Sequence, residues 1–313
     1  MEKSIRQVYG ETLREIGETN TNLVVLDADV SSSTQTKLFA QSYPDRFFNM
    51  GIAESDMVSV AAGLSTMGLI PVVNTFAAFI DSNGLLSIRT LVCYGNFNVK
   101  VAGGYAGLSD SFDGASHHAV DDLAVMSAQP GMQILCPCDS QSAKALTRLM
   151  IKTNGPCYIR LSREAFPNVY TEEASFVPGG ANVIREGCDV AVFACGIMVS
   201  TALKAAQILE KKGISICVVD VYSVKPINEE VLVSISHRVR GIVVAEEHSV
   251  YGGLTSIVAQ IILKKGRPVP LESVSIMDTF TESGPYLELL QKYGLGVAAV
   301  TDKVHAVLER CDR

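Results

Sequence analysis

Short apolar runs alternate with amphipathic stretches along most of the chain, and this alternation restricts the fold more than any other feature of the sequence. Runs of strand length recur at 23–26, 71–73, 99–102, 133–135 and 157–159. The alternation predicts βα units, and therefore an α/β fold with a mostly parallel sheet and helices on both faces. Hydrophobic residues make up 48% of the chain and charged residues 19%, as expected when both faces of a sheet are covered.

The alternation is interrupted once, over residues 166–187, where Pro, Gly and Glu accumulate. Such a composition is typical of a crossing between domains. After it, strands are expected at 190–194, 215–219 and 241–245, and helices at 200–212, 229–236 and 254–265. We therefore predict two three-layer α/β domains, one over residues 1–165 and a smaller one over 188–313, joined by a linker over 166–187.

The 24 residues from Met57 to Ile80 carry no charge, which raises the question of a membrane span. Pro71 would break a spanning helix, so a buried helix, a turn and a buried strand explain the stretch better. In that helix the i, i+3, i+4, i+7 spacing predicts one stripe facing the sheet, formed by Met57, Val60, Ala61 and Leu64. We expect no membrane association.

Charge, histidine and cysteine usage argue against several other classes of protein. The chain has 26 basic and 33 acidic residues, a net charge of −7, and no basic cluster, which argues against a nucleic-acid partner. The five histidines and eight cysteines show no zinc-binding spacing, so we expect no protein-built metal site. We expect the cysteines to be free thiols. The N-terminal residues do not resemble a signal peptide, and a cytoplasmic location is expected.

Parallel α/β sheets bind ligands at the carboxyl ends of their strands, so the turns from strand to helix are where functional residues are expected. Four turns carry polar or aromatic side chains: 26–33, 47–57, 74–79 and 110–118. Helix capping explains part of the first, and Glu54 in the second would complement a helix dipole or serve a ligand. Phe76 and Phe79 suit core packing or stacking on a ligand, and the loop at His117 is of the exposed kind that often carries function.

Taken together, these segments resemble the C-terminal half of transketolase. The motifs that carry the resemblance are GIAE (51–54), TFxxF (75–79), DGASH (113–117), PGM (130–132) and GPCYIRLSR (155–163). The segment VAEEHSVYGGL (244–254) resembles the family's C-terminal domain, so the similarity covers essentially the whole chain. The resemblance implies a pyrimidine-binding domain of a thiamine-diphosphate enzyme, followed by a transketolase C-terminal domain.

The resemblance assigns roles to the residues expected near thiamine diphosphate. In the family, the glutamate that matches Glu54 hydrogen-bonds a pyrimidine ring nitrogen and triggers activation of the cofactor, a catalytic role. The aromatics that match Phe76 and Phe79 pack against the pyrimidine. Asp29 and Val30 match the segment beside the thiazolium ring.

The resemblance also implies substrate contacts. His117 matches a histidine that assists proton transfer near a substrate oxygen, and Asp113 matches an aspartate that bonds a substrate hydroxyl. Ser33 and Arg163 match groups that hold the distal anion of the sugar, and a guanidinium suits a sugar phosphate or a sugar sulfonate. Tyr105 stands where most members have a substrate-contacting histidine.

The sequence departs from the family pattern around the substrate, at Tyr105, Ser82, His118 and the run 109–112. We predict transfer of a two-carbon ketol unit from a ketose donor to an aldose acceptor. A non-standard sugar, sulfonated or branched, is a hypothesis that these departures suggest, and ordinary pentose phosphates stay open.

The sequence lacks the Gly-Asp-Gly motif with a later asparagine through which the family binds magnesium and the diphosphate. We therefore predict a split transketolase, active only with an N-terminal-type subunit that holds magnesium and the diphosphate, in a complex with two copies of each chain. A 2-oxoacid dehydrogenase β subunit, a deoxyxylulose-phosphate synthase-like decarboxylating enzyme and a non-catalytic scaffold subunit are the alternatives. The H-S-Q loop usual in the first of these is absent.

Overall fold

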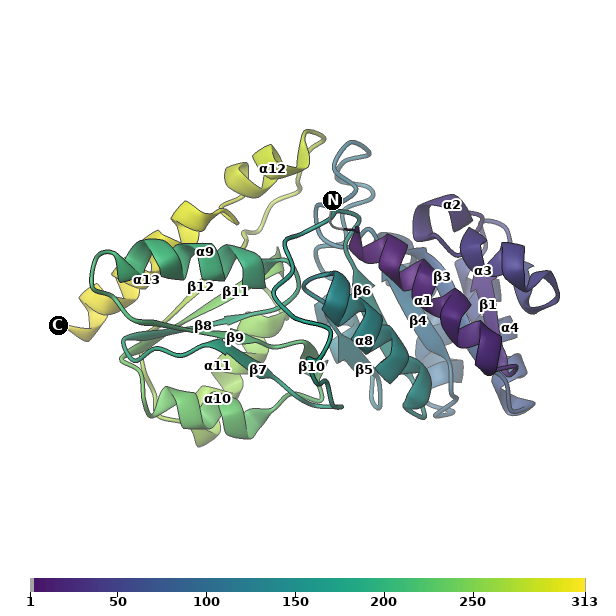
Figure 1. Cartoon of the computed structure of the whole chain (residues 1–313), viewed down its shortest axis with the longest axis horizontal. Helices are drawn as coiled ribbons and strands as arrows, with labels where there is room; N and C mark the ends of the chain where they lie inside the picture. The colour runs from purple at the N-terminus through teal and green to yellow at the C-terminus, as the bar shows by residue number, and fades with distance from the viewer. Residues whose placement is uncertain (1–2, 313) are drawn as a thin grey trace.

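The structure, a computed structural model that describes residues 3–312, contains two α/β sheets side by side (Figure 1). The first sheet has seven strands in the order β10-β5-β6-β4-β3-β1-β2, and all neighbours pair in parallel except β10 and β5. Its strands are β1 (Leu23–Asp27), β2 (Phe47–Asn49), β3 (Ile70–Phe76), β4 (Lys100–Gly104), β5 (Gln133–Leu135), β6 (Cys157–Leu161) and β10 (Ser223–Lys225).

Helices cover both faces of this sheet, as the continuous apolar strands predict. All five residues of β1 are buried, with Leu23 and Val25 in the core under one face and Val24 and Leu26 in the core under the other. Helices α1 (Ile5–Thr19), α3 (Lys37–Ser42) and α8 (Ser140–Lys152) pack on the first face. Helices α4 (Glu54–Thr66) and α7 (Asp122–Ser127) pack on the second. The short helices are α2 (Ser31–Thr34), α5 (Ala77–Ile80) and α6 (Leu85–Ser87), with a 3-10 turn at Pro44–Arg46 and a π-helical turn at Ile88–Cys93.

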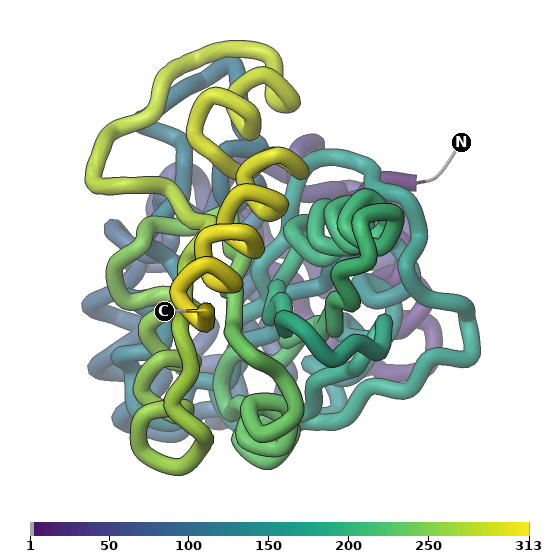
Figure 2. The backbone as a smooth tube through the Cα atoms, turned by 90° about the vertical axis from the view of Figure 1, so that its left-hand side faces the viewer, coloured from purple at the N-terminus to yellow at the C-terminus, as the bar shows by residue number. Residues whose placement is uncertain are grey.

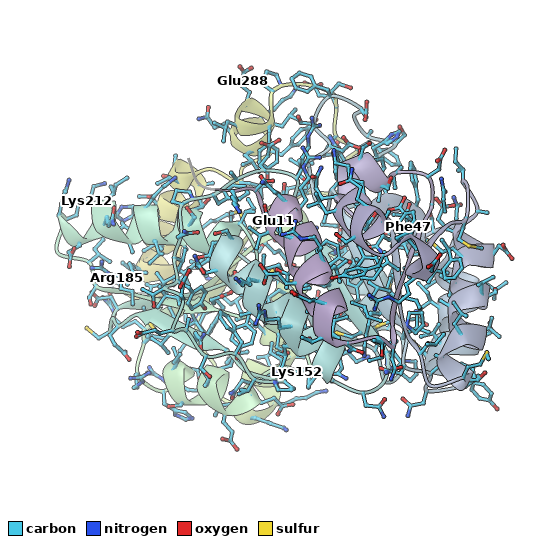
Figure 3. All side chains as sticks on the ribbon, turned by 45° about the vertical axis from the view of Figure 1, so that its right-hand side comes forward. Glu11, Phe47, Lys152, Arg185, Lys212 and Glu288 are labelled. Carbon is cyan, nitrogen blue, oxygen red and sulfur yellow. The ribbon has the colours of Figure 1, made fainter. Side chains whose placement is uncertain are left out.

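The second sheet has five strands in the order β12-β11-β8-β9-β7, with β7 alone antiparallel to its neighbour. The strands are β7 (Asn182–Arg185), β8 (Val190–Ala194), β9 (Ile216–Asp220), β11 (Gly241–Ser249) and β12 (Leu271–Ile276). The helices are α9 (Met198–Glu210), α10 (Glu229–Ser236), α11 (Leu254–Lys265), α12 (Tyr286–Lys292) and α13 (Val297–Cys311). The side chains of Lys212 and Glu288 project from the edge of the molecule, while apolar side chains fill the space between the layers (Figure 3).

The chain crosses between the two sheets more than the sequence predicts. Strand β7 lies inside the segment 166–187 that was expected to be a linker. Strand β10 leaves the second half of the chain and pairs with β5 in the first sheet, with Ser223 opposite Leu135. Strands β7 and β10 have only four and three residues and mix polar with apolar side chains, so they show no clear periodicity, and their partners are distant in sequence.

Helix α4 shows where the predicted stripe was wrong. Met57 and Ala61 are buried, and Leu64 packs against the core, but Val60 is 37% exposed. The buried positions of α4 are Glu54, Met57, Val58, Ala61 and Ala62. They follow the i, i+3, i+4, i+7, i+8 spacing from Glu54, because the carboxyl at the start of the helix lies on the buried face.

Three further expectations can be compared with the described residues. No helix within residues 3–312 is long and apolar enough to cross a membrane. All eight cysteines are free thiols, and most of them are buried. The uncharged run from Met57 to Ile80 forms α4, β3 and α5, as its interpretation as helix, turn and strand predicts.

A buried ion pair lies at the junction of the two sheets. Arg160 on β6 donates from Nε to both carboxylate oxygens of Asp122, at 2.8 and 3.1 Å, and both side chains are almost fully buried. Its Nη2 donates to the backbone oxygens of Ala119 and Glu247, and Glu247 belongs to the second sheet. Tyr158 also donates to Asp122, at 2.7 Å. One guanidinium therefore joins the end of a long loop, the start of α7 and strand β11.

Removing one member of this pair should destabilise the whole chain. We expect Asp122→Ala to lower the free energy of unfolding by about 3–5 kcal/mol, because it leaves a buried guanidinium without its counter-charge. Denaturant unfolding measures this. The control is Glu210→Ala, which removes the partly exposed pair with Arg185 and should cost about 1 kcal/mol or less. Equal losses in the two variants would contradict the prediction.

Candidate active site

Glu54 is a buried carboxylate whose oxygens accept only long hydrogen bonds. It is the first residue of α4 and is 4% exposed. The hydroxyl of Thr75 and the side-chain amide of Asn83 donate to its two oxygens, both at 3.4 Å. These are long hydrogen bonds, so the carboxylate keeps capacity for a stronger partner. The uncharged run 57–80, which forms the rest of α4, β3 and α5, surrounds it on the buried side.

Four rings gather beside the carboxyl ends of β3 and β4. The ring centroid of Phe76 lies 4.6 Å from that of Tyr105 and 5.7 Å from that of Phe79. The His117 ring meets Phe79 edge-on at 5.0 Å. Phe79 and His117 are half-buried, whereas Phe76 and Tyr105 are buried. The predicted cofactor aromatics and the predicted substrate residues therefore form one cluster.

Two guanidinium groups flank Tyr105. Arg6 on α1 donates to the Tyr105 hydroxyl at 2.8 Å and to the backbone oxygen of Ser33 at 3.1 Å. The guanidinium carbons of Arg6 and Arg163 lie 5.4 and 5.3 Å from the centre of the Tyr105 ring. Arg6 Nε is buried and has no partner. This end of the cluster is positively charged and suits an anion.

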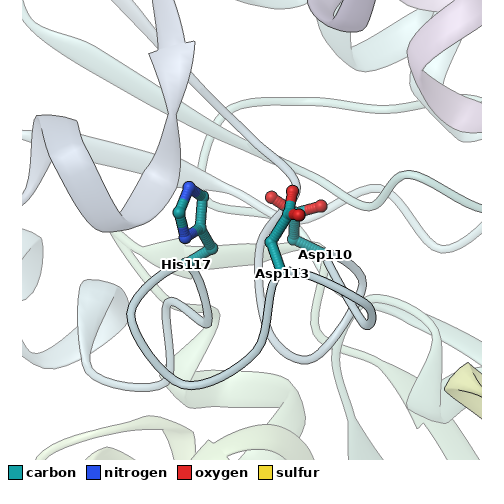
Figure 4. A group of neighbouring side chains, drawn as sticks. All are labelled: Asp110, Asp113 and His117. Carbon is teal, nitrogen blue, oxygen red and sulfur yellow. The ribbon is translucent and has the colours of Figure 1, made fainter. Parts of the chain in front are cut away.

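Asp110, Asp113 and His117 stand close together on the loop after β4 (Figure 4). One potential ligand atom from each lies within 4.8 Å of the others. Arg163 Nη1 is 3.6 Å from Asp110, so a cationic side chain already faces this carboxyl. Burial, followed by the neighbouring Asp113, raises the pKa of Asp110 to about 6, and His117 and Arg163 oppose that shift. One oxygen of Asp110 is buried without a partner.

The carboxylates in the turn after β1 form hydrogen bonds with residues outside the ring cluster. Asp27 accepts hydrogen bonds from the Val30 amide at 2.6 Å and from the hydroxyls of Thr34 and Thr36 at 2.8 Å. Burial raises the pKa of Asp27 although these donors oppose the shift. Asp29 has a φ of +64° and accepts from the Asn49 side chain at 2.8 Å. This network fixes the backbone of Asp29 and Val30, and the exposed Asp29 carboxylate points to Asn49 rather than to the rings.

Several residues that line this candidate site were not predicted from the sequence. Arg6 lies on the N-terminal helix, far in sequence from Tyr105, and one arginine in a helix carries no recognisable signal. Asp110 was included only as part of a polar loop, although a carboxylate three residues before Asp113 was a visible hint. Thr75 and Asn83, which contact Glu54, lie in or beside the TFxxF segment and were not singled out.

The chain matches the models of two domains that belong to one family. Residues 1–168 match the transketolase pyrimidine-binding domain, and residues 179–300 match the transketolase C-terminal domain. The chain therefore belongs to the transketolase family. Membership of this family implies dependence on thiamine diphosphate.

Similar proteins place the chain more closely within the family. A putative transketolase C-terminal section from Methanocaldococcus jannaschii is 40% identical, over 96% of this chain and 95% of the relative. A 6-deoxy-6-sulfo-D-fructose transketolase subunit from Clostridium sp. (strain MSTE9) is 36% identical, over 98% and 95%. A solved split-gene transketolase, described as an inactive beta4 tetramer, superimposes with a TM-score of 0.90 at 43% identity, over 99% of both chains. Within the family the chain is thus the C-terminal-type subunit of a split transketolase.

The raised pKa of Asp110 gives a pH-dependent prediction. The folded pKa of about 6 lies above the ordinary 3.8, so the fold favours the protonated carboxyl, and this stabilisation is lost as the pH rises from about 4 to above 6. Asp110→Asn imitates the protonated form. We expect it to raise the melting temperature at pH 7.5 and to change it little at pH 4, as measured by thermal unfolding across that range. A gain that shrinks with rising pH would contradict this.

Proposed function

We propose that this subunit supplies the pyrimidine side of each active site, with Glu54 as the residue that activates thiamine diphosphate. The observation that carries the proposal is the buried Glu54 carboxylate, whose oxygens accept only two long hydrogen bonds, from Thr75 and Asn83, the residues that precede and follow the Phe76–Phe79 segment. The partner is an N-terminal-type transketolase subunit, which holds the diphosphate and its magnesium ion. In the described part of this chain, the carboxylate cluster at Asp110 already faces Arg163, which supports placing the metal on the partner.

The residues present fit the pyrimidine half of the cofactor. Glu54 offers an acceptor for a ring nitrogen, and burial strengthens such a hydrogen bond because water does not compete. Phe76 and Phe79 give apolar faces for an aromatic ring. The backbone of Asp29 and Val30, held by Asp27, would face the other ring. Thiamine diphosphate, when bound, would supply the electron sink for breaking and forming the carbon–carbon bond next to a carbonyl.

The positions of His117, Asp113 and Ser33 suit the substrate contacts that were predicted for them. His117 is half-buried between Phe79 and the open side of the loop, where its ring can hold or pass a proton at a substrate oxygen. Asp113 is exposed two residues after the buried Ser111 and can accept from a substrate hydroxyl. Ser33 sits beside Arg6, which donates to its backbone oxygen.

The guanidinium groups of Arg6 and Arg163 support a sugar with an anionic end, either a phosphate or a sulfonate, as the substrate class. The Tyr105 ring lies between the two guanidinium groups, and the Asp110 carboxyl faces Arg163. The site is therefore less positively charged than two arginines alone would make it. A sulfonated sugar is the non-standard substrate we favour, because one relative is named for 6-deoxy-6-sulfo-D-fructose. A branched sugar is the other candidate from the sequence.

Exposed apolar side chains near Glu54 support a partner subunit and self-association. Helix α4 lies beside α6, where the hydroxyls of Ser55 and Ser59 hydrogen-bond that of Ser87. Ile52 is 83% exposed and Leu86 on α6 is 70% exposed. Exposed apolar side chains that form a contiguous patch are typical of an interface, and Ile52 and Leu86 are candidates for such a patch. The inactive beta4 tetramer of the relative is consistent with a subunit that self-associates and needs another chain for activity. We propose two copies of each subunit.

Glu54→Gln tests the central role. We expect the reconstituted two-chain complex to assemble normally but to lose ketol transfer by about 10²- to 10⁴-fold, because the amide cannot exchange the proton that a carboxyl can. Steady-state rates and size-exclusion chromatography measure the two quantities. Asp56→Asn, an exposed carboxylate on the same helix, is the matched control and should retain activity.

The same assay separates the alternatives. The subunit alone should neither turn over nor bind thiamine diphosphate tightly. Carbon dioxide release from a 2-oxoacid would favour a decarboxylating enzyme instead, and full activity of Glu54→Gln would favour a scaffold role.

The anion site gives a separate prediction. We expect Arg6→Ala and Arg163→Ala to raise KM for a sugar phosphate or sulfonate by about 10-fold or more, since each removes a charge-assisted hydrogen-bond donor. KM for an uncharged sugar should change little, and the exposed Arg14→Ala on α1 is the control. A comparison of donors then identifies the anion, and high efficiency on xylulose 5-phosphate would refute the specialised substrate.

A further inference from the structure

The second domain contacts the loop that carries Asp113 and His117. We call residues 105–118 the active-site loop. The Leu108 amide donates to Glu247 Oε1 at 2.9 Å, and the Gly284 amide donates to the Ser111 backbone oxygen at 2.9 Å. The ring of His118 shares a 2.6 Å hydrogen bond with the Thr281 hydroxyl. The loop is thus held near its start, its middle and its end.

Two separate segments of the second domain make these contacts. Glu247 lies on β11, whereas Thr281 and Gly284 lie on the segment between β12 and α12. In Figure 2 the yellow-green stretch after β12 runs beside the blue active-site loop at the top of the molecule. Within the active-site loop, Gly114 has a φ of +79°, and a Cβ there would lie 2.4 Å from the Ser283 hydroxyl oxygen. The two domains are therefore fitted closely along the whole loop.

Glu247 is the most constrained of these contacts. It is 2% exposed, and its Oε1 accepts from both the Leu108 amide and the Tyr286 hydroxyl, each at 2.9 Å. A Cβ on Gly107, whose φ is +65°, would lie 2.2 Å from the Glu247 side chain. Leu108 is fully buried, so water could not replace the Glu247 carboxyl as the acceptor of its amide. Removal of the Glu247 side chain would therefore leave this buried amide without a partner.

The charged groups around Glu247 explain how a carboxyl is tolerated there. Arg160 faces it from β6, and Asp122 faces it from α7. Burial raises the pKa of Glu247 to about 7, although Arg160, the Leu108 amide and the Tyr286 hydroxyl oppose the shift. Oε1 can accept whether or not the other oxygen carries a proton. A glutamine would keep that acceptor and would resemble the protonated carboxyl.

We propose that Glu247 and Thr281 are positioning residues for the transketolase reaction, through which the second domain sets the place of Asp113 and His117. The inference rests on the proposed roles of those two residues. In this proposal the C-terminal domain contributes to catalysis, although the domain itself lies outside the ring cluster. Neither Glu247 nor Thr281 touches the substrate in this proposal; each acts through the backbone or ring of the active-site loop.

The test compares neighbouring buried acids in the complete two-chain complex. Glu247→Ala removes the acceptor of the Leu108 amide, and Glu247→Gln retains it. Glu246→Ala is the matched control, because Glu246 is also fully buried but caps α11 by accepting from the Leu254 and Thr255 amides. Thr281→Val is a milder variant that removes only the hydrogen bond to His118. Assays are made well below each melting temperature.

We expect Glu247→Ala to lower kcat/KM for the sugar by about 10- to 100-fold, as displaced catalytic groups do, and Glu247→Gln to recover most of it. Thr281→Val should lower kcat/KM in the same direction. The half-saturating concentration of thiamine diphosphate should change much less than kcat/KM, because Glu54, Phe76 and Phe79 lie on other elements and meet the active-site loop only through the rings of Tyr105 and His117. Hydrogen exchange of peptides from the active-site loop should rise in Glu247→Ala and not in Glu246→Ala.

Equal losses of kcat/KM in the Glu247→Ala and Glu246→Ala complexes would overturn the inference, as would unchanged exchange of the active-site loop in Glu247→Ala. If the unaltered complex shows no ketol transfer, the proposed function fails, while the exchange comparison still tests whether the second domain holds the loop.

Discussion

The arrangement of this protein depends on one buried guanidinium at the junction of its two sheets. Arg160 pairs with Asp122 at the start of α7 and also donates to the backbones of Ala119 and Glu247. A buried charge is tolerated only when its donors are satisfied, so these three elements must meet at one place. Through this requirement the sheet that carries the aromatic cluster, the end of the active-site loop and the second domain are fixed relative to one another.

The candidate site contains two chemical environments. Glu54 is buried at the start of α4, beside the uncharged run 57–80, where the exclusion of water would strengthen a hydrogen bond to its carboxyl. Arg6 and Arg163 flank Tyr105 and make the surroundings of that ring cationic, moderated by the Asp110 carboxyl. This difference suits a reaction in which one end of a sugar is held by charge while bonds change at the other end.

Much of the fold could be predicted, and candidate site residues could be named, because their signals are local. Strand β8 and helices α10 and α11 lie at their expected residues. Glu54, Phe76 and Phe79 belong to short motifs near the ends of strands. The missed features depend on distant partners. Strand β10 is recognisable only beside β5, and Arg6 acquires a role only beside Tyr105. The expected stripe of α4 was displaced because a carboxyl on the buried face does not register as part of an apolar pattern.

The sequence by itself therefore determined the βα architecture, the transketolase resemblance and the carboxylate at the start of α4, because periodicity and short motifs are properties of neighbouring residues. Only the tertiary structure decided that Arg6 and Arg163 flank Tyr105 and that Glu247 of the second domain accepts from the Leu108 amide. These contacts join residues far apart in the chain, and they form because buried donors must find acceptors once the two sheets have packed.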